Sequence, residues 1–131
     1  MPVTGTAATT SYTVRERDTA ETLGSGDLPV LGTPRLVAWA EYATGSAIAD
    51  DLDDASTSVG TRVDIEHLRP SPVDAAVSVR AELTAVDGRS MRFDVSAAHD
   101  DGGVVGQGEV VRMVVATGSC RPDQMPWVAR G

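Results

Sequence analysis

One helical segment followed by four strand segments is the pattern that most limits how this chain can fold. Residues 33–50, entered through Gly32, place apolar side chains at intervals of three and four, which is typical of a helix with one buried face. Period-two alternation of apolar and polar residues then predicts strands, because successive side chains of a strand point to opposite faces. An earlier strand is expected at 11–18, and the later strands at 57–69, 75–86, 89–99 and 103–116.

The connections between the last three strands are short. Asp87-Gly88 is a tight hairpin turn, and residues 100–103, Asp-Asp-Gly-Gly, make a slightly longer one. Three consecutive strands joined by hairpins form an antiparallel sheet. The long helix that precedes them must bury its apolar face against that sheet. The predicted fold class is therefore α+β, with an antiparallel sheet wrapped around one long central helix.

Length and composition fit one domain. The chain has 131 residues, of which 41% are hydrophobic, enough for a single core. Residues 1–10 are small and polar and are expected to be a disordered tail, leaving residues 11–131 as the domain. This tail has neither a basic region nor an apolar stretch, so it is not a signal peptide or anchor. The single cysteine, Cys120, can form no intramolecular disulfide and belongs to no metal-binding cluster, which fits a reducing cytoplasm.

The formal charge of −8 opposes binding to nucleic acid or to an anionic membrane. Both partners require clustered Lys and Arg, whereas the 11 basic residues here are dispersed. A smaller phosphorylated ligand is not excluded, because it needs only a few local cations. Five arginines in the strand region can supply them: Arg62, Arg69, Arg89, Arg92 and Arg112.

Thr33, Glu41 and His67 combine a hydroxyl, a carboxylate and an imidazole, and are the candidate catalytic residues. Thr33 is expected to be the helix N-cap, with Pro34 in the first turn. Glu41 falls within the predicted inward stripe, where a carboxylate must find a partner. Eight residues separate it from Thr33, about two turns of helix, so both can border one cleft. The stripe itself is expected to comprise Val37, Ala40, Thr44, Ala47 and Ile48.

His67 is the last member of an otherwise apolar strand face that includes Val63 and Ile65. An imidazole titrates near neutrality and can act as a general base. Each candidate also has a purely structural interpretation: Thr33 as a cap, Glu41 as an ion-pair partner of Arg112, and His67 as a hydrogen-bonded residue at a strand end. The second histidine, His99, precedes a turn and is expected in solvent without a role.

The order and spacing of these residues resemble the fluoroacetyl-CoA thioesterase-like family of the hotdog-fold thioesterases. In that family a Thr at the helix start is followed eight residues later by Glu, and a Gly-Thr strand carries His seven residues after the Gly. Here these are Thr33, Glu41, Gly60-Thr61 and His67. The similarity extends over residues 12 to 116, through Ala81-Glu82-Leu83, Val86-Asp87-Gly88-Arg89, Val95-Ser96-Ala97, Gly106-Gln107-Gly108 and Arg112.

The resemblance implies a hotdog fold and an acyl-CoA or acyl-carrier-protein thioesterase that needs no cofactor, coenzyme A being part of the substrate. It implies catalysis by Thr33, Glu41 and His67, with Gly60, Thr61 and Arg112 in contact with the substrate. It also implies a homodimer, or a higher assembly of dimers, with the cleft at the subunit interface. Whether an acyl-enzyme forms or water attacks directly stays open, as do the acyl group and its carrier.

The chain departs from the family in the loop before the helix, where the family places bulky aromatic residues over the acyl group. Residues 24–31 read Gly-Ser-Gly-Asp-Leu-Pro-Val-Leu, and Phe93 is the only phenylalanine. A general acyl thioesterase is therefore expected, without selectivity for a fluorinated acyl group. Two alternatives remain: a non-catalytic acyl-CoA-binding hotdog protein, and a hotdog enoyl-CoA hydratase or dehydratase.

Overall fold

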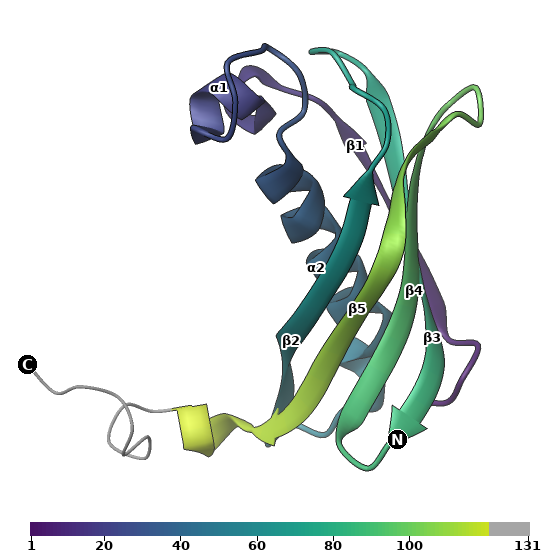
Figure 1. The fold of residues 1–131 in the computed structure, drawn as a ribbon. Helices are drawn as coiled ribbons and strands as arrows, with labels where there is room; N and C mark the ends of the chain where they lie inside the picture. The colour runs from purple at the N-terminus through teal and green to yellow at the C-terminus, as the bar shows by residue number, and fades with distance from the viewer. Residues whose placement is uncertain (121–131) are drawn as a thin grey trace, which may run out of the picture.

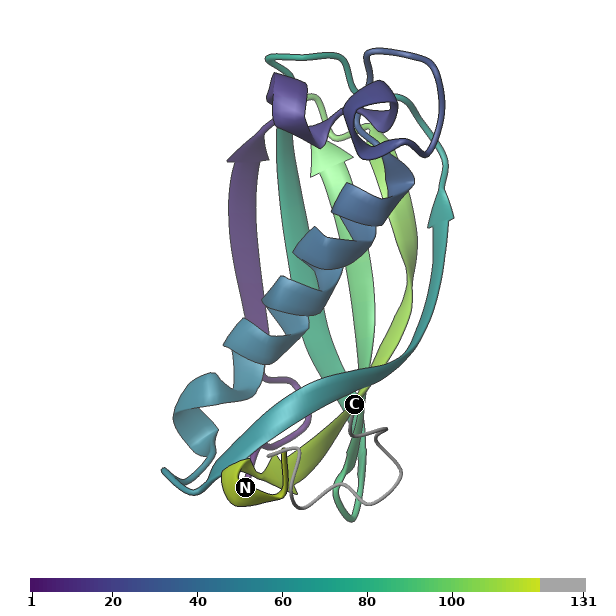
Figure 2. The same ribbon diagram turned by 90° about the vertical axis from the view of Figure 1, so that its left-hand side faces the viewer.

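The structure, a computed structural model, describes residues 1–120. Five antiparallel strands form one sheet in the order β1-β3-β4-β5-β2, and the long helix α2 lies across its concave face (Figures 1 and 2). The elements are β1 (Ala7–Thr13), α1 (Ala20–Leu23), α2 (Thr33–Ile48), β2 (Ser56–His67), β3 (Ala76–Asp87), β4 (Ser90–His99) and β5 (Val104–Ala116), with 3₁₀ turns at Glu16–Asp18, Ala49–Asp51 and Thr117–Cys120.

The predicted α+β architecture is confirmed, and the last four strands lie within two residues of their expected limits. The first strand was placed wrongly. β1 begins at Ala7, inside the segment expected to be a disordered tail, and residues 16–18 of the expected strand form a 3₁₀ turn. Main-chain pairing to β3 orders this segment, from Ala7 opposite Glu82 to Thr13 opposite Ala76. A threonine-rich strand held by its backbone leaves little hydrophobic signal in the sequence.

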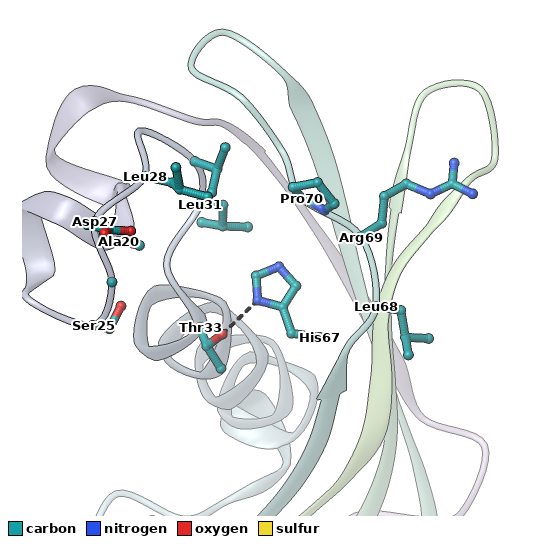
Figure 3. Close-up of a pocket in the computed structure, with 12 residues that line it drawn as sticks. Ala20, Ser25, Asp27, Leu28, Leu31, Thr33, His67, Leu68, Arg69 and Pro70 are labelled. Carbon is teal, nitrogen blue, oxygen red and sulfur yellow. Dashed lines mark hydrogen bonds between the residues drawn. The ribbon is translucent and has the colours of Figure 1, made fainter.

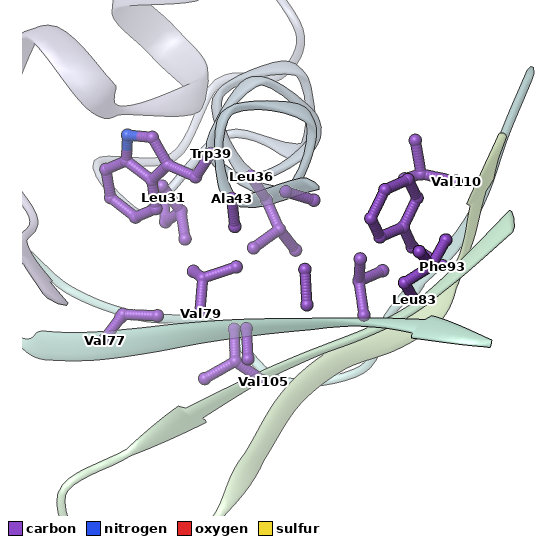
Figure 4. Close-up of a cluster of buried hydrophobic side chains, with 14 of the residues drawn as sticks. Leu31, Leu36, Trp39, Ala43, Val77, Val79, Leu83, Phe93, Val105 and Val110 are labelled. Atoms are coloured by element: carbon purple, nitrogen blue, oxygen red, sulfur yellow. The ribbon is translucent and has the colours of Figure 1, made fainter. Parts of the chain in front are cut away.

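The core lies between α2 and the inner face of the sheet (Figure 4). Ala40, Thr44 and Ile48 of the predicted helix stripe are buried, but Val37 and Ala47 are only half-buried. The buried face is rotated toward Leu36, Trp39 and Ala43 because α2 lies mainly against β3 and the edge strand β1. The sheet contributes Phe93, Leu83, Met91, Val79 and Val110 to this core.

β2 is an edge strand that pairs with β5 alone among the described strands, and most of its side chains are exposed. Val59 is 42% exposed and Val63 is 36% exposed. Apolar side chains on an unpaired strand edge favour association with another chain. No helix among residues 1–120 is both long enough and apolar enough to cross a membrane.

Candidate active site

A hydrogen bond joins Thr33 to His67, two of the three predicted catalytic residues. Thr33 Oγ1 lies 2.8 Å from His67 Nδ1, across the gap between the start of α2 and the end of β2. The expectation that Thr33 is the N-cap is wrong: Gly32 occupies that position, with extended backbone, and Thr33 is the first helical residue. Because its hydroxyl does not cap the helix, it is available to the imidazole.

The Thr33–His67 pair borders a cavity of about 310 Å³. Figure 3 shows the two side chains meeting at the N-terminal end of α2, beneath the loop that precedes the helix. That loop and the segment after β2 provide the walls, whose residues are Ala20, Ser25, Gly26, Asp27, Leu28, Val30, Leu31, Leu68, Arg69 and Pro70. The loop side chains are aliphatic or small, as expected from the missing aromatic residues.

The imidazole of His67 is partly desolvated. Burial lowers its pKa below the ordinary value, and the backbone of Arg69 partly offsets this effect. The Nε2 atom is buried and has no hydrogen-bond partner among residues 1–120. A buried polar atom without a partner is costly unless a ligand or water completes it. If Thr33 donates to Nδ1, then Nε2 carries the proton; if Nδ1 donates, then Nε2 is a free base.

Glu41 does not line this cavity within one protomer. It borders a second hollow of about 460 Å³, together with Tyr42, Gly45, Ser46, Ala49 and Arg112. Its carboxylate is directed at Gly60, where an added Cβ would lie 2.5 Å from Glu41 Oε2. The carboxylate has no hydrogen bond or ion pair to any residue that the structure describes. Within one protomer, Thr33 and His67 thus border the first cavity, whereas Glu41 borders the second hollow.

Arg112 does not form the ion pair with the Glu41 carboxylate that was considered as a structural alternative. Its Nη1 donates to the Glu41 carbonyl oxygen at 3.2 Å, and its Nε donates to Ser58 Oγ at 2.8 Å. The guanidinium therefore ties α2 to β2. Burial lowers the pKa of Arg112, and the nearby Glu41 charge opposes this shift. The residue places a half-buried positive charge near the Glu41 carboxylate.

A β-bulge determines which way Gly60 faces. Gly60 and Arg62 pair with the consecutive residues Arg112 and Val111, so Thr61 is the additional residue. Seven residues separate Gly60 from His67, which in a regular strand would put them on opposite faces. The extra residue of the bulge shifts the alternation by one, so Gly60 and His67 both face α2. Thr61 instead donates its hydroxyl to the Val111 carbonyl oxygen at 3.2 Å.

His99 has a partner that the sequence did not reveal. Its Nε2 lies 2.7 Å from Oγ of Ser71, a residue with 0% exposure in the connection between β2 and β3. The expectation that His99 is free in solvent was therefore wrong. The one signal in the sequence is the Pro70-Ser71-Pro72 triplet, which holds a small polar residue between two rigid ones.

Comparisons with known proteins identify the family of this chain. The family described as "FlK: Fluoroacetyl-CoA-specific thioesterase" matches residues 14–118. The fluoroacetyl-CoA thioesterase of Streptantibioticus cattleyicolor is 35% identical over 86 residues, which cover 66% of this chain and 61% of that protein. The aligned part thus spans less than two thirds of that relative.

Solved structures include members of the same family. A mutant of the fluoroacetyl-CoA-specific thioesterase FlK, in complex with fluoroacetate and CoA, has a TM-score of 0.84 and 28% identity, covering 92% of this chain and 100% of that one. A hot-dog-like protein from Thermanaerovibrio acidaminovorans has a TM-score of 0.80 and 21% identity, covering 88% and 84%, and supports the fold alone. The fold is the hotdog fold, and the chain belongs to the fluoroacetyl-CoA-specific thioesterase family.

Proposed function

We propose that this protein is a thioesterase that hydrolyses acyl-CoA, with an acyl-carrier protein as the alternative thiol carrier. The observation that carries the proposal is the Thr33–His67 hydrogen bond at the edge of a cavity, with His67 Nε2 lacking a hydrogen-bond partner among residues 1–120. Family membership supports the reaction type, because the matched family is one of thioester hydrolases. Thioester hydrolysis needs a base near neutral pH, and His67 is suited to that role.

Two routes are compatible with this pair. In the first, His67 takes the proton of Thr33, whose oxygen attacks the thioester carbonyl and forms an acyl-enzyme that water then hydrolyses. In the second, His67 removes a proton from water, and the resulting hydroxide attacks directly. Backbone N–H groups at the start of α2 would stabilise the developing oxyanion in either case.

Glu41 joins this chemistry if the site is shared between two subunits. Within one protomer it is about two helical turns from Thr33, a rise of about 12 Å. The β2 edge is unpaired among the described strands and exposes Val59 and Val63, so a two-fold axis at Asp64 would pair β2 with its copy antiparallel. Because Thr61 is the additional residue of the bulge, that register sets His67 opposite Gly60 of the partner subunit. The partner's Glu41, which packs on its own Gly60, would then reach the Thr33–His67 pair.

This arrangement explains why the Glu41 carboxylate has no partner among the described residues of its own chain. In the assembled site it would orient the imidazole or position the attacking water, while Arg112 holds the Glu41 backbone in place. A homodimer with two equivalent clefts is therefore part of the proposal, as is a cytoplasmic location. Gly60 and Arg112 belong to the same cleft, and Thr61 contributes through the bulge that orients Gly60.

We expect the site to accept a wider range of acyl groups than fluoroacetyl. The loop wall of the cavity contains Gly26, Asp27 and Leu28, of which Leu28 is 61% exposed. No aromatic ring from residues 24–31 closes over the cavity. A longer acyl chain could leave the cavity between these small side chains, whereas an aromatic lid would restrict the site to short groups.

The test is thiol release from short, medium and aromatic acyl-CoA esters by the purified protein, beside a His67→Ala control. Release by the wild type alone would support a thioesterase that uses His67, and the preferred ester would define the substrate class. Tight binding of CoA esters without turnover would favour the non-catalytic binder. Loss of enoyl absorbance without thiol release would favour the hydratase.

A further inference from the structure

The bond between Ser71 and His99 lies outside the cavity, yet Ser71 contacts both chain segments that carry the Thr33–His67 pair. Ser71 follows His67 by four residues, in the connection from β2 to β3. Its carbonyl oxygen accepts a hydrogen bond of 2.8 Å from the amide of Leu31, two residues before Thr33. Val30 and Pro72 extend this contact as an isolated antiparallel bridge. Ser71 is thus the point where the two segments are joined.

His99 is fixed in the sheet and holds Ser71 through their hydrogen bond. It is the last residue of β4, pairs with Val77 of β3, and donates its own amide to the Gly103 carbonyl oxygen at 2.9 Å. Ser71 has 0% exposure, and among residues 1–120 its hydroxyl has His99 as its only hydrogen-bond partner. Buried hydroxyls that keep a hydrogen bond hold their segment in one position, whereas unsatisfied ones favour rearrangement.

We propose that Ser71 and His99 are positioning residues for catalysis: their hydrogen bond fixes the separation of the Thr33 hydroxyl from the His67 imidazole. The bond anchors the Ser71 backbone to the sheet, and that backbone holds the entry to α2 on one side and the exit from β2 on the other. Neither residue lines the cavity. The inference rests on the proposed function for its kinetic consequence, but its effect on His67 is measurable without substrate.

The chain contains only two histidines, so replacing His99 leaves a single imidazole to follow. In both His99→Leu and His99→Gln, His67 is the only imidazole, so its NMR titration is assigned directly. Gln places an amide nitrogen near the position of Nε2 and can keep the bond to Ser71, whereas Leu cannot. Ser71→Ala removes the same bond from the other end, and its His67 signal is identified by comparison with His99→Gln.

We expect His99→Leu and Ser71→Ala to raise the pKa of His67 toward its ordinary value, because a loosened imidazole is better hydrated. Both should lower kcat about tenfold or more with a smaller change in KM, since small displacements of reacting groups are costly. His99→Gln should keep both properties close to wild type. The double variant Ser71→Ala with His99→Leu should be no worse than either single one, because all three lack the same bond.

Ile48→Val is the matched control for stability. Ile48 is fully buried at the far end of α2 from Thr33, so this variant lowers the melting temperature without touching the site. If His99→Leu and Ser71→Ala behave like Ile48→Val, with a lower melting temperature but unchanged His67 titration, the positioning role is refuted. If wild type hydrolyses no ester, the proposed function fails, while the titration still decides this inference. Should one variant not fold, the other removes the same bond.

Discussion

A Cβ added at Gly60 would lie 2.5 Å from Oε2 of Glu41, so the carboxylate of the helix occupies the space that glycine leaves on the strand. The same imaginary Cβ would lie 3.9 Å from Nη1 of Arg112. Glycine here leaves room for a neighbouring side chain and does not serve a turn. This contact fixes the carboxylate at the β2 edge, where a second subunit can meet it.

Gly60→Ala should displace the Glu41 carboxylate while leaving the fold intact. Because the new methyl group would overlap Oε2, Glu41 must rotate away, and we expect thiol release to fall by about tenfold or more. Gly118→Ala is the control, since a Cβ there meets no atom of residues 1–120 within 4 Å. Equal activity of the two variants would show that the position of the Glu41 carboxylate does not matter for turnover.

Thr33→Val should separate catalysis from stability. Thr33 is exposed and does not cap α2, so the free energy of unfolding should change by less than about 0.5 kcal/mol. Thiol release should fall by about a hundredfold or more, because the hydroxyl bonded to His67 is lost. Thr33→Ser should retain most activity. A stability loss near 1 kcal/mol, as for a true N-cap, would contradict the assignment of Gly32 to that position.

The pH dependence follows from the lowered pKa of His67. The neutral imidazole is the base, so kcat/KM should stay high below pH 6.5, the ordinary value, and fall only as pH drops through the lower pKa of the folded protein. A rate profile from pH 4 to 8 measures this limb. An acid limb centred above pH 6.5 would exclude a desolvated His67 as the base.

The same shift makes stability depend on pH. The unfolded chain binds a proton at His67 more readily than the folded chain does, so the free energy of unfolding decreases as pH falls from 6.5 to the lower folded pKa. His67→Gln should remove this part of the acid dependence. Denaturant unfolding of both proteins across that range gives the difference, and parallel curves would contradict the prediction.

Mixed dimers test whether Glu41 acts across the interface. The Glu41→Gln and His67→Gln proteins should each be inactive as homodimers. After unfolding and refolding together, half the dimers are mixed, and each mixed dimer contains one intact site, so about one quarter of wild-type activity should return. Each protein refolded alone is the control. If mixing restores no activity, Glu41 and His67 act within one chain or do not act together.

Arg112→Met should lower the stability of the protein and have little effect on the Thr33–His67 hydrogen bond. The guanidinium makes hydrogen bonds to Ser58 and to the Glu41 carbonyl oxygen, and its loss leaves partly buried acceptors unpaired. We expect a loss of about 2 kcal/mol in the free energy of unfolding, measured by denaturant titration. An unchanged stability would mean that water replaces these bonds without cost.

The sequence by itself determined the element order, because the helical and strand periodicities are strong in the segments that bury one face. Helix 33–48 and the four strands after it were predicted within two residues, and the three candidate residues were named from their spacing. β1 was misplaced because its order comes from main-chain pairing with β3, which requires no hydrophobic pattern.

Only the tertiary structure decided how the polar side chains are grouped. The pairing of Thr33 with His67, the bulge that turns Gly60 toward α2, and the distance of Glu41 from both depend on how β2 packs against α2 and β5. His99 and Ser71 meet although 28 residues separate them. Local periodicity fixes which face a residue occupies along its own element, but contacts between elements depend on register and crossing angle, which the sequence pattern does not encode.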